Sequence, residues 1–435
     1  MENSDIAILG AGMSGLSLGT ELSRRGIPFT VYEAEATPGG LCRTWRTGPF
    51  RWDLGVHALY SKDNAFQDFL TSLPLSYQSC DRTVKICHLA NDAVYELEYP
   101  FENGLYQLPD DDWEDCIVGY MESCASKTNS FKNLSDWIYC GLGSGIARCF
   151  MIPYNTKIWN SQLDNISLKL VSNKIEPEPF EKIIQGALGH RYIGRAYQSK
   201  FLYPHNGIQT LVDTLHAPIS RSVHLNKLLR RITPQANGYT LDFADATHAT
   251  CRTIISTIPL PTLIDALPYP ELAARREQLR HNDTFFIMIG LKDGKAFGRF
   301  KSCHWVFFAG DEIFYRLTFM ENFYDGFRPA VVAEYTVKTG DVVSRDALVE
   351  TVVSDLLRRG ILGSADDIAC VDTQFQQYTY PIPTLDLDDV KTYLTEFLAA
   401  KNIYLVGRNG AWEYLNIDGV FASATRFVAA MPYRS

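Results

Sequence analysis

The sequence lacks the features that mark several large classes of protein. No apolar run comes close to the roughly 20 residues that span a bilayer, and neither an internal repeat nor a low-complexity tract is present. The first residues show no charged-then-apolar signal pattern, so the expected location is the cytoplasm. A formal net charge of −9 disfavours a general binder of nucleic acid or of anionic membranes, but leaves room for a local basic pocket.

Disulfide and metal-ligand spacings are also missing. The ten cysteines include no Cys-x-x-Cys pair, and we expect them to be reduced and mostly buried thiols. The nine histidines show no metal-ligand spacing, so no metal site is predicted. What remains is an ordinary globular composition over 435 residues, enough for two or three domains.

The start of the chain carries a dinucleotide-binding pattern. An apolar run over residues 5–9 is followed at once by Gly10, Gly12 and Gly15, then by a helical segment and a second strand-like run that ends at Glu33. Such glycines allow a tight turn and let a pyrophosphate approach the helix N-terminus, while the acid suits a ribose diol. The pattern predicts a βαβ nucleotide site. The alternative is a glycine turn in an unrelated α/β domain.

Three further segments resemble the large FAD family that contains amine oxidases, protoporphyrinogen oxidases and UDP-galactopyranose mutases. "ATPGGLCRTW" resembles the family's second phosphate and flavin contact, with Gly39, Gly40 and Arg43. Residues 223–261 resemble the strand and β-hairpin that return to the nucleotide domain, which implies that Val223 lies near the adenine. The resemblance implies FAD as the cofactor.

The third segment, "NIYLVGRNG", is a strand followed by a glycine turn near the end of the chain. In this family that turn returns to the flavin. The resemblance therefore implies that Gly407 belongs to the cofactor site and that Arg408 lies near the ribityl–pyrophosphate region.

The middle of the chain is similar, segment by segment and in the same order, to UDP-galactopyranose mutases, more to the eukaryotic type than to the compact bacterial one. The segments are residues 50–70, 99–117, 134–160, 305–323 and 378–390. The resemblance implies a redox-neutral reaction on a nucleotide-diphosphate sugar, in which N5 of reduced FAD attacks the anomeric carbon. The protein would bind the diphosphate, hold the base and keep water out.

The resemblance assigns the diphosphate to two cationic positions. Arg316 falls on a mutase arginine, and guanidinium geometry favours bidentate contact with phosphate. The second arginine is expected 15 residues after Trp159, which the resemblance also places on the substrate side. Lys174 stands at that position; it keeps the positive charge but lacks the paired donors of a guanidinium. Alternatively, Arg316 pairs with a nearby acid, Asp311 or Glu312, and Lys174 is a solvated helix residue.

The base and sugar positions match in part. Tyr99 and Asn155 fall on base-binding positions, whereas Glu102 stands where a glutamine is expected and accepts hydrogen bonds without donating any. Tyr380 and Tyr414 match tyrosines that line the diphosphate and sugar. The alternative for the aromatic residues is a place in the hydrophobic core.

Four more positions complete the implied site. Phe307 stands at a third tyrosine position, subject to a one-residue gap in the alignment. His57 matches a flavin-side histidine whose loop responds to the flavin's redox state; the alternative is a satisfied turn or core histidine. Asn416 falls on a polar position that faces the sugar, and Asp418 on the substrate or flavin edge.

The expected fold is α/β: a doubly wound, Rossmann-like FAD-binding domain, a mostly helical cap and an antiparallel substrate sheet. The acids of "LPDDDWED" suit a helix N-terminus and are assigned no chemistry. The expected domains are the discontinuous FAD domain at residues 1–75, 205–265 and 395–435, the cap at 76–204 and the sheet at 266–394.

The leading hypothesis is a flavin-dependent mutase that acts on a nucleotide sugar. The alternative is an FAD-dependent oxidoreductase, of the amine oxidase or desaturase kind, that takes hydride from a small molecule; a third class is a flavin-holding scaffold without turnover. No second dinucleotide fingerprint is present for an electron donor such as NAD(P)H, although that nucleotide could still bind transiently in the same cleft. The sequence carries no oligomerisation signature.

Overall fold

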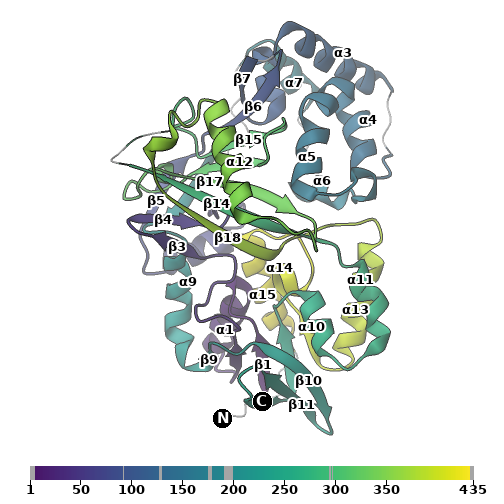
Figure 1. The fold of residues 1–435 in the computed structure, drawn as a ribbon. Helices are drawn as coiled ribbons and strands as arrows, with labels where there is room; N and C mark the ends of the chain where they lie inside the picture. The colour runs from purple at the N-terminus through teal and green to yellow at the C-terminus, as the bar shows by residue number, and fades with distance from the viewer. Residues whose placement is uncertain are drawn as a thin grey trace.

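The computed structural model describes residues 5–91, 93–126, 130–174, 179–190, 199–292, 295 and 297–431, with the backbone alone at 172–174. In Figure 1 the nucleotide-binding part lies at the bottom with both ends of the chain, the helical cap lies at the top, and a large sheet lies between them. In these ranges no helix combines the length and the apolar character needed to cross a bilayer.

A five-stranded parallel sheet forms the centre of the nucleotide-binding part, in the order β19-β13-β1-β2-β9. Its central strand, "IAIL", is buried on both faces, with Ile6 and Ile8 in one hydrophobic cluster and Ala7 and Leu9 in another. This continuous apolar run is what a parallel strand covered on both sides requires. The strands are β1 (Ile6–Leu9), β2 (Thr30–Tyr32), β9 (Val223–His224), β13 (Thr253–Ser256) and β19 (Ile403–Leu405).

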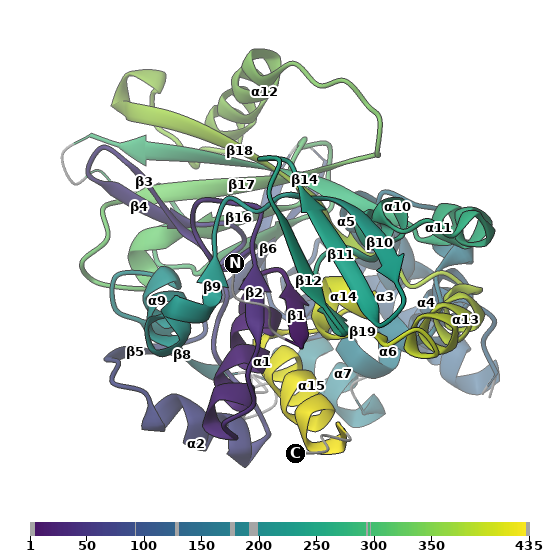
Figure 2. The same ribbon diagram turned by 90° about the horizontal axis from the view of Figure 1, so that it is seen from below.

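Different elements cover the two faces of this sheet, as the view from below shows (Figure 2). One face packs against helices α1, α9 and α15, and the other against a three-stranded antiparallel sheet, β10-β11-β12, with α10. The bounds are α1 (Met13–Arg24), α2 (Asn64–Ser72), α9 (Gln209–His216), β10 (Leu229–Gln235), β11 (Gly238–Phe243), β12 (His248–Cys251), α10 (Leu260–Ala266), α11 (Ala273–Gln278), α13 (Leu387–Ala399), α14 (Gly407–Gly410) and α15 (Ile417–Ala430).

The large sheet has seven strands in the order β18-β14-β17-β16-β15-β6-β7. All neighbours are antiparallel except β15 and β6. The bounds are β6 (Val84–Ala90), β7 (Ala93–Glu98), β14 (His281–Leu291), β15 (Trp305–Phe308), β16 (Arg316–Phe319), β17 (Ala330–Val337), β18 (Ile368–Pro381) and the covering helix α12 (Arg345–Arg358).

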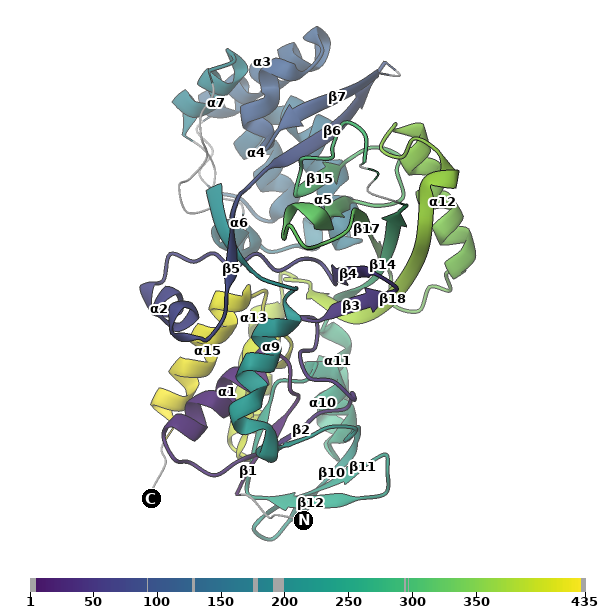
Figure 3. The ribbon, with the colours of Figure 1, turned by 90° about the vertical axis from the view of Figure 1, so that its left-hand side faces the viewer.

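The cap is helical, and one small strand pair connects it to the nucleotide-binding part. In Figure 3 the pair of β5 (Tyr77–Asp81) and β8 (Lys200–Pro204) runs between the cap and the nucleotide-binding part, while β3 (Thr44–Thr47) pairs with β4 (Phe50–Asp53). The cap elements are the 3₁₀ helix η1 (Phe101–Gln107), α3 (Asp110–Ser126), α4 (Leu134–Ile146), the π-helical turn η2 (Ala147–Met151), α5 (Ile152–Trp159), α6 (Lys169–Lys174) and α7 (Phe180–Ala187).

The predicted fold class is confirmed: a Rossmann-like α/β part, a helical cap and an antiparallel sheet are all present. The structure differs at one expected boundary, because β6 and β7 lie within residues 76–204 but complete the large sheet. The return to the nucleotide-binding part is also larger than a hairpin, since β12 adds a third strand. The domain boundaries at the residues given above remain a prediction.

Candidate active site

One cavity of about 1050 Å³ lies where the three parts meet. Its walls come from the glycine loop after β1, the loop after β4, η1 and α5 of the cap, strands β15 to β18, and the C-terminal turn. Pockets for a single small ligand measure about 300–1000 Å³. The cavity therefore lies at the upper end of the size range of ligand pockets.

The glycine loop has a different steric requirement at each of its three glycines. Gly10 has a φ of +96°, and a Cβ at Gly15 would lie 1.9 Å from the carbonyl oxygen of Gly10. A Cβ at Gly12 would meet nothing closer than 3.9 Å, and Gly12 faces the cavity. Gly10 thus makes the turn, Gly15 lets α1 pack on β1, and Gly12 leaves room for a phosphate at the N-terminus of α1.

Glu33 closes the same end of the cavity at the end of β2. Its Oε2 accepts a hydrogen bond from the backbone N–H of Ala11 at 2.6 Å, and its Oε1 accepts one from Glu35 at 3.0 Å. Both hydrogen bonds hold the carboxylate beside the glycine loop and leave lone pairs for a ribose diol. This is the arrangement that the sequence pattern predicts.

The second glycine pair adds a backbone surface opposite Gly12. Gly39 and Gly40 have φ values of +123° and +58°, and Gly39 forms an isolated parallel bridge with Gly12. Arg43 donates from Nε to the carbonyl oxygen of Gly40 at 2.9 Å, and it lines the cavity. An uncapped helix N-terminus, a glycine cradle and an acid beside them are the donor and acceptor set that the FAD pyrophosphate and ribose need.

Val223, which the resemblance places near the adenine, does not line the cavity. Val223 pairs with Val31 in the parallel sheet and belongs to the hydrophobic core, outside the cavity wall. The cavity is lined there by Lys227, Leu228 and Leu229, which follow β9.

The C-terminal turn, which precedes α15 in the chain, reaches the cavity. Gly407 has a φ of +80°, and a Cβ there would lie 1.9 Å from the Oγ of Ser14, so the turn packs directly on the start of α1. Gly407 lies behind the wall, whereas Asn416 and Asp418 line the cavity. The carboxylate of Asp418 accepts a hydrogen bond from the hydroxyl of Ser61 at 2.9 Å.

Arg408 lies against the two tyrosines that the resemblance places at the sugar and diphosphate. Its guanidinium carbon is 4.9 Å from the ring centre of Tyr380 and 4.6 Å from that of Tyr414, and the two rings stack 5.8 Å apart. It donates only to the backbone carbonyls of Leu415 and Thr379, and its Nε is buried without a partner. No carboxylate within the described ranges pairs with Arg408, so its positive charge is uncompensated.

Arg316 is held by a buried acid. Its Nε and Nη2 each lie 2.7 Å from a carboxylate oxygen of Glu334 on the neighbouring strand, and the hydroxyl of Tyr315 donates to the same carboxylate at 2.6 Å. The alternative partners, Asp311 and Glu312, were wrong, because both acids pair elsewhere, with arginines of and just after α12. Nη1 of Arg316 has no hydrogen-bond partner among the residues described, which leaves it for a ligand.

His57 lies on the loop after β4, near both arginines. Burial, together with the positive charges of Arg408 and Arg316, lowers the pKa of His57 to about 3. Its Nδ1 is buried without a hydrogen-bond partner. The imidazole is therefore neutral at physiological pH and brings no further positive charge to the cavity.

The cap side of the cavity is aromatic. Tyr99 and Phe307 lie 5.3 Å apart, ring centre to ring centre. Asn155 is fixed on α5: its Nδ2 donates to a backbone carbonyl one turn earlier, and its Oδ1 accepts from the indole N–H of Trp159 at 3.2 Å. Glu102 is buried in the same wall.

The structure thus brings most of the predicted residues to one cavity. Lys174 is the last residue of α6, and its side chain lies outside the described part of the chain. Of the predicted site residues, the cavity is lined by Gly10, Gly12, Glu33, Gly39, Gly40, Arg43, His57, Tyr99, Glu102, Asn155, Trp159, Phe307, Arg316, Tyr380, Arg408, Tyr414, Asn416 and Asp418.

Several wall residues were missed by sequence reasoning, and three of them contact predicted site residues. Glu334 was unremarkable in a strand-like run, and its role depends on the register that places it opposite Arg316. Arg82 lies with its guanidinium 4.9 Å from the ring centre of Tyr99. Tyr154, adjacent to the predicted Asn155, lies 5.4 Å from Phe307, and burial raises the pKa of its hydroxyl well above the usual value.

Two family models match the chain. An NAD(P)-binding Rossmann-like domain matches residues 8–73, and the flavin containing amine oxidoreductase family matches residues 165–431, more than half of the chain. The chain belongs to the flavin containing amine oxidoreductase family. FAD is its cofactor, in agreement with the glycine cradle and Glu33.

Solved structures share the whole fold. A reduced UDP-galactopyranose mutase is 24% identical with a TM-score of 0.89, covering 98% of this chain and 96% of that one. A candidate protoporphyrinogen oxidase from Exiguobacterium sp. 255-15 is 17% identical with a TM-score of 0.79, covering 99% of both chains. A putrescine oxidase bound to putrescine is 16% identical with a TM-score of 0.69, covering 98% of both chains. The mutase likeness agrees with the recognised resemblance, and the fold is shared by isomerising and oxidising enzymes.

Proposed function

We propose that the protein is a flavin-dependent mutase that interconverts ring forms of a sugar carried on a nucleotide diphosphate, without net oxidation. Two things support this proposal: the similarity of the whole chain to a reduced UDP-galactopyranose mutase, and the charge of the cavity beside the FAD cradle.

The observation that carries the proposal is the uncompensated charge of Arg408 over the stacked pair of Tyr380 and Tyr414. A partly buried guanidinium without a carboxylate attracts an anionic ligand, and diphosphate oxygens match its donors. An amine such as putrescine carries positive charge at neutral pH, and Arg408 would repel it. The cavity therefore favours a nucleotide sugar over the substrate class of the amine oxidases.

In this proposal, the chain's own residues hold the diphosphate while its bond to the sugar breaks and re-forms. Nη1 of Arg316 and the guanidinium of Arg408 face the phosphates, and the rings of Tyr380 and Tyr414 line the sugar position. Neutral His57 offers a ring nitrogen for a hydrogen bond on the flavin side. Bound reduced FAD supplies the nucleophile for the anomeric carbon. The largely apolar cap wall keeps water from the reacting carbon.

The test is anaerobic. The purified holoenzyme is reduced with dithionite and incubated with UDP-galactopyranose and a panel of other nucleotide sugars, and the products are separated by chromatography. We expect an isomer that forms only after reduction, with no peroxide. If instead a candidate amine or alcohol bleaches the oxidised flavin and oxygen is then consumed, the protein is an oxidoreductase and the proposal is wrong.

Arg408→Ala provides the residue-level arm of the same test. Loss of a charge-assisted contact to a diphosphate weakens nucleotide binding by about 10–100-fold, since such a bond contributes about 1.5–3 kcal/mol. Exposed Arg426, on α15 and outside the cavity wall, is the matched control, and Arg426→Ala should bind as wild type does. FAD content, measured in parallel, separates this role from one at the ribityl–pyrophosphate region: loss of FAD from Arg408→Ala would assign the arginine to the cofactor.

A further inference from the structure

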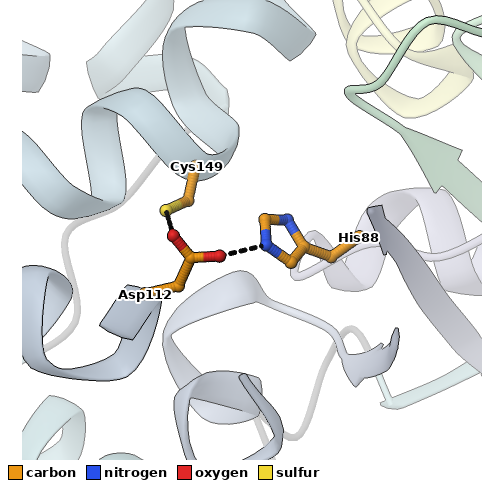
Figure 4. Close-up of side chains that lie close together, drawn as sticks. All are labelled: His88, Asp112 and Cys149. Carbon is orange, nitrogen blue, oxygen red and sulfur yellow. Dashed lines mark hydrogen bonds and ion pairs between the residues drawn. The ribbon is translucent and has the colours of Figure 1, made fainter. Parts of the chain in front are cut away.

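Three potential metal ligands from separate elements meet where the cap contacts the large sheet, outside the wall of the active-site cavity. His88 comes from β6, Asp112 from the first turn of α3 and Cys149 from η2, and Figure 4 shows the carboxylate between the imidazole and the thiol. Asp112 Oδ2 lies 2.8 Å from His88 Nε2, and Asp112 Oδ1 lies 3.5 Å from Cys149 Sγ. All three ligand atoms lie within 4.8 Å of one another.

We propose that His88, Asp112 and Cys149 bind one zinc ion, which joins the cap to the large sheet. Imidazole nitrogen, thiolate sulfur and carboxylate oxygen are the three ligand types that zinc takes in proteins. With zinc–ligand bonds of about 2.0–2.3 Å, the ligand atoms of a tetrahedral site lie about 3.3–3.8 Å apart. To reach that geometry, Asp112 Oδ2 and His88 Nε2, now 2.8 Å apart, must separate by about half an ångström, and a separation at the 4.8 Å limit must close by about 1 Å.

The charges of the site balance. The Asp112 carboxylate and the Cys149 thiolate together neutralise the two positive charges of the ion, and neutral imidazole adds none. Binding releases one proton, from the Cys149 thiol to solvent. His88 and Cys149 are buried, so the complex would lie largely out of water without net charge. A neutral buried complex avoids the cost of an unpaired buried ion.

The neighbours of the trio are compatible with a bound cation. Arg148 contacts Asp112 at 3.4 Å but also pairs with Asp115 at 2.5 Å, and its side chain is 57% exposed, so it can keep Asp115 and leave Asp112. Cys116, one turn after Asp112 on α3, is fully buried; hydrogen bonding with Cys149 and burial raise the pKa of its thiol. A protonated Cys116 would donate to the Cys149 thiolate as an outer-shell ligand partner.

The fourth position would be taken by water. A surface cavity of about 480 Å³ is lined by all three ligands, Arg148 and Gly310. A water ligand from this cavity completes the tetrahedron without another side chain.

A zinc ion here would influence the active site through the cap. Cys149 sits on a π-helical turn, an element that often occurs at functional sites, and this turn leads directly into α5. The helix α5 carries Asn155 and Trp159 of the cavity wall. Fixing η2 to β6 would therefore fix the entry of α5 relative to the sheet that carries Arg316.

The proposal is tested by metal content in the full-length holoenzyme. Protein expressed with added zinc and then desalted should retain about one zinc per chain by elemental analysis, whereas Cys149→Ser and Asp112→Asn should lose most of it. Both substitutions nearly preserve side-chain shape, and flavin absorption verifies that the variants fold. Exposed Cys124, also on α3, is the matched control, and Cys124→Ser should keep its zinc.

Cobalt gives a second readout that reports the ligands directly. Replacing zinc with Co²⁺ should give the strong d–d absorption of a tetrahedral site, at wavelengths beyond the flavin bands, and Cys149→Ser should abolish it. A wild-type protein that retains no zinc after desalting, or variants that retain as much as wild type, would overturn the proposal and leave a hydrogen-bonded trio only. Neither measurement needs a substrate, so the result is independent of the proposed mutase reaction.

Discussion

At the residue scale, the pair of Arg316 and Glu334 shows how a side chain that we propose to bind a phosphate is held in place without a ligand. Glu334 is 1% exposed and takes two of the arginine's donors, and the hydroxyl of Tyr315 holds the same carboxylate. The arginine is thus held in place, and its Nη1 has no hydrogen-bond partner among the described residues. Because the side chain is already held in place, it would lose less conformational entropy when a phosphate binds.

The pair makes a stability prediction. Arg316→Ala leaves the Glu334 carboxylate buried and unpaired, which should lower the free energy of unfolding by about 3–5 kcal/mol. The double variant Arg316→Met with Glu334→Gln removes both charges, so its free energy of unfolding should fall by clearly less than that of Arg316→Ala. Urea unfolding followed by circular dichroism measures both. Equal losses in the single and double variants would show that the pair is not desolvated as described.

At the scale of elements, the first βαβ unit divides its steric tasks between two glycines. Gly12 faces open space at the phosphate end of α1, while Gly15 lies against the carbonyl oxygen of Gly10 where α1 packs on β1. One position controls access for the cofactor and the other controls helix packing. The two effects are separable by the same small substitution.

Gly12→Ala should fold as wild type does but bind FAD more weakly, because its methyl group occupies phosphate space. Gly15→Ala places a Cβ 1.9 Å from the Gly10 oxygen, so α1 must shift and the FAD-free protein should itself lose about 1–3 kcal/mol of stability. Flavin absorption of the purified variants and thermal unfolding after FAD removal measure the two effects. Equal stability of both FAD-free variants would contradict the packing role of Gly15.

At the scale of the whole molecule, a buried carboxylate joins segments that are distant in the chain. Asp53 of β4 is fully buried and accepts hydrogen bonds from the hydroxyls of Thr44 in β3 and Tyr203 in β8, the strand that returns from the cap. Burial raises the pKa of Asp53 to about 6, against the lowering effect of both hydroxyls. A raised pKa means that the folded state binds more protons than the unfolded state between about pH 4 and 6, so Asp53 favours folding at the acid side of this window.

Tyr203→Phe should therefore lower the free energy of unfolding by a larger amount as the pH rises. At about pH 5 the Asp53 carboxyl is mostly protonated, so the substitution removes a neutral hydrogen bond. At about pH 8 the carboxyl is ionised, so the substitution removes a charge-assisted hydrogen bond, and the loss of unfolding free energy is about 1 kcal/mol larger. Tyr77→Phe, in the paired strand β5, is the matched control, because Tyr77 donates to a backbone carbonyl and its loss should not depend on pH. Urea unfolding at the two pH values compares the variants. A pH-independent cost for Tyr203→Phe would exclude an ionised Asp53.

The parts of this protein that the sequence determined by itself are those in which the physics is local. The turn, the helix start and the acid of the nucleotide site lie within a few dozen residues, so their spacing alone predicts the cradle that the structure shows around Gly12 and Glu33. The apolar run of β1 likewise predicts a strand buried on both faces. Ordered resemblance along the chain added the aromatic and cationic residues of the substrate side.

Only the tertiary structure decided which groups meet across long stretches of chain. The partner of Arg316 follows from the register of β16 against β17, so neighbouring acids in the sequence gave the wrong candidates. Asp112 looked like a helix-start acid, yet His88 is 24 residues before it and Cys149 is 37 residues after it. No spacing rule spans such separations, because strand pairing and helix packing set them. These long-range contacts give Arg316 its fixed position and make a zinc site conceivable in a chain that shows no zinc motif.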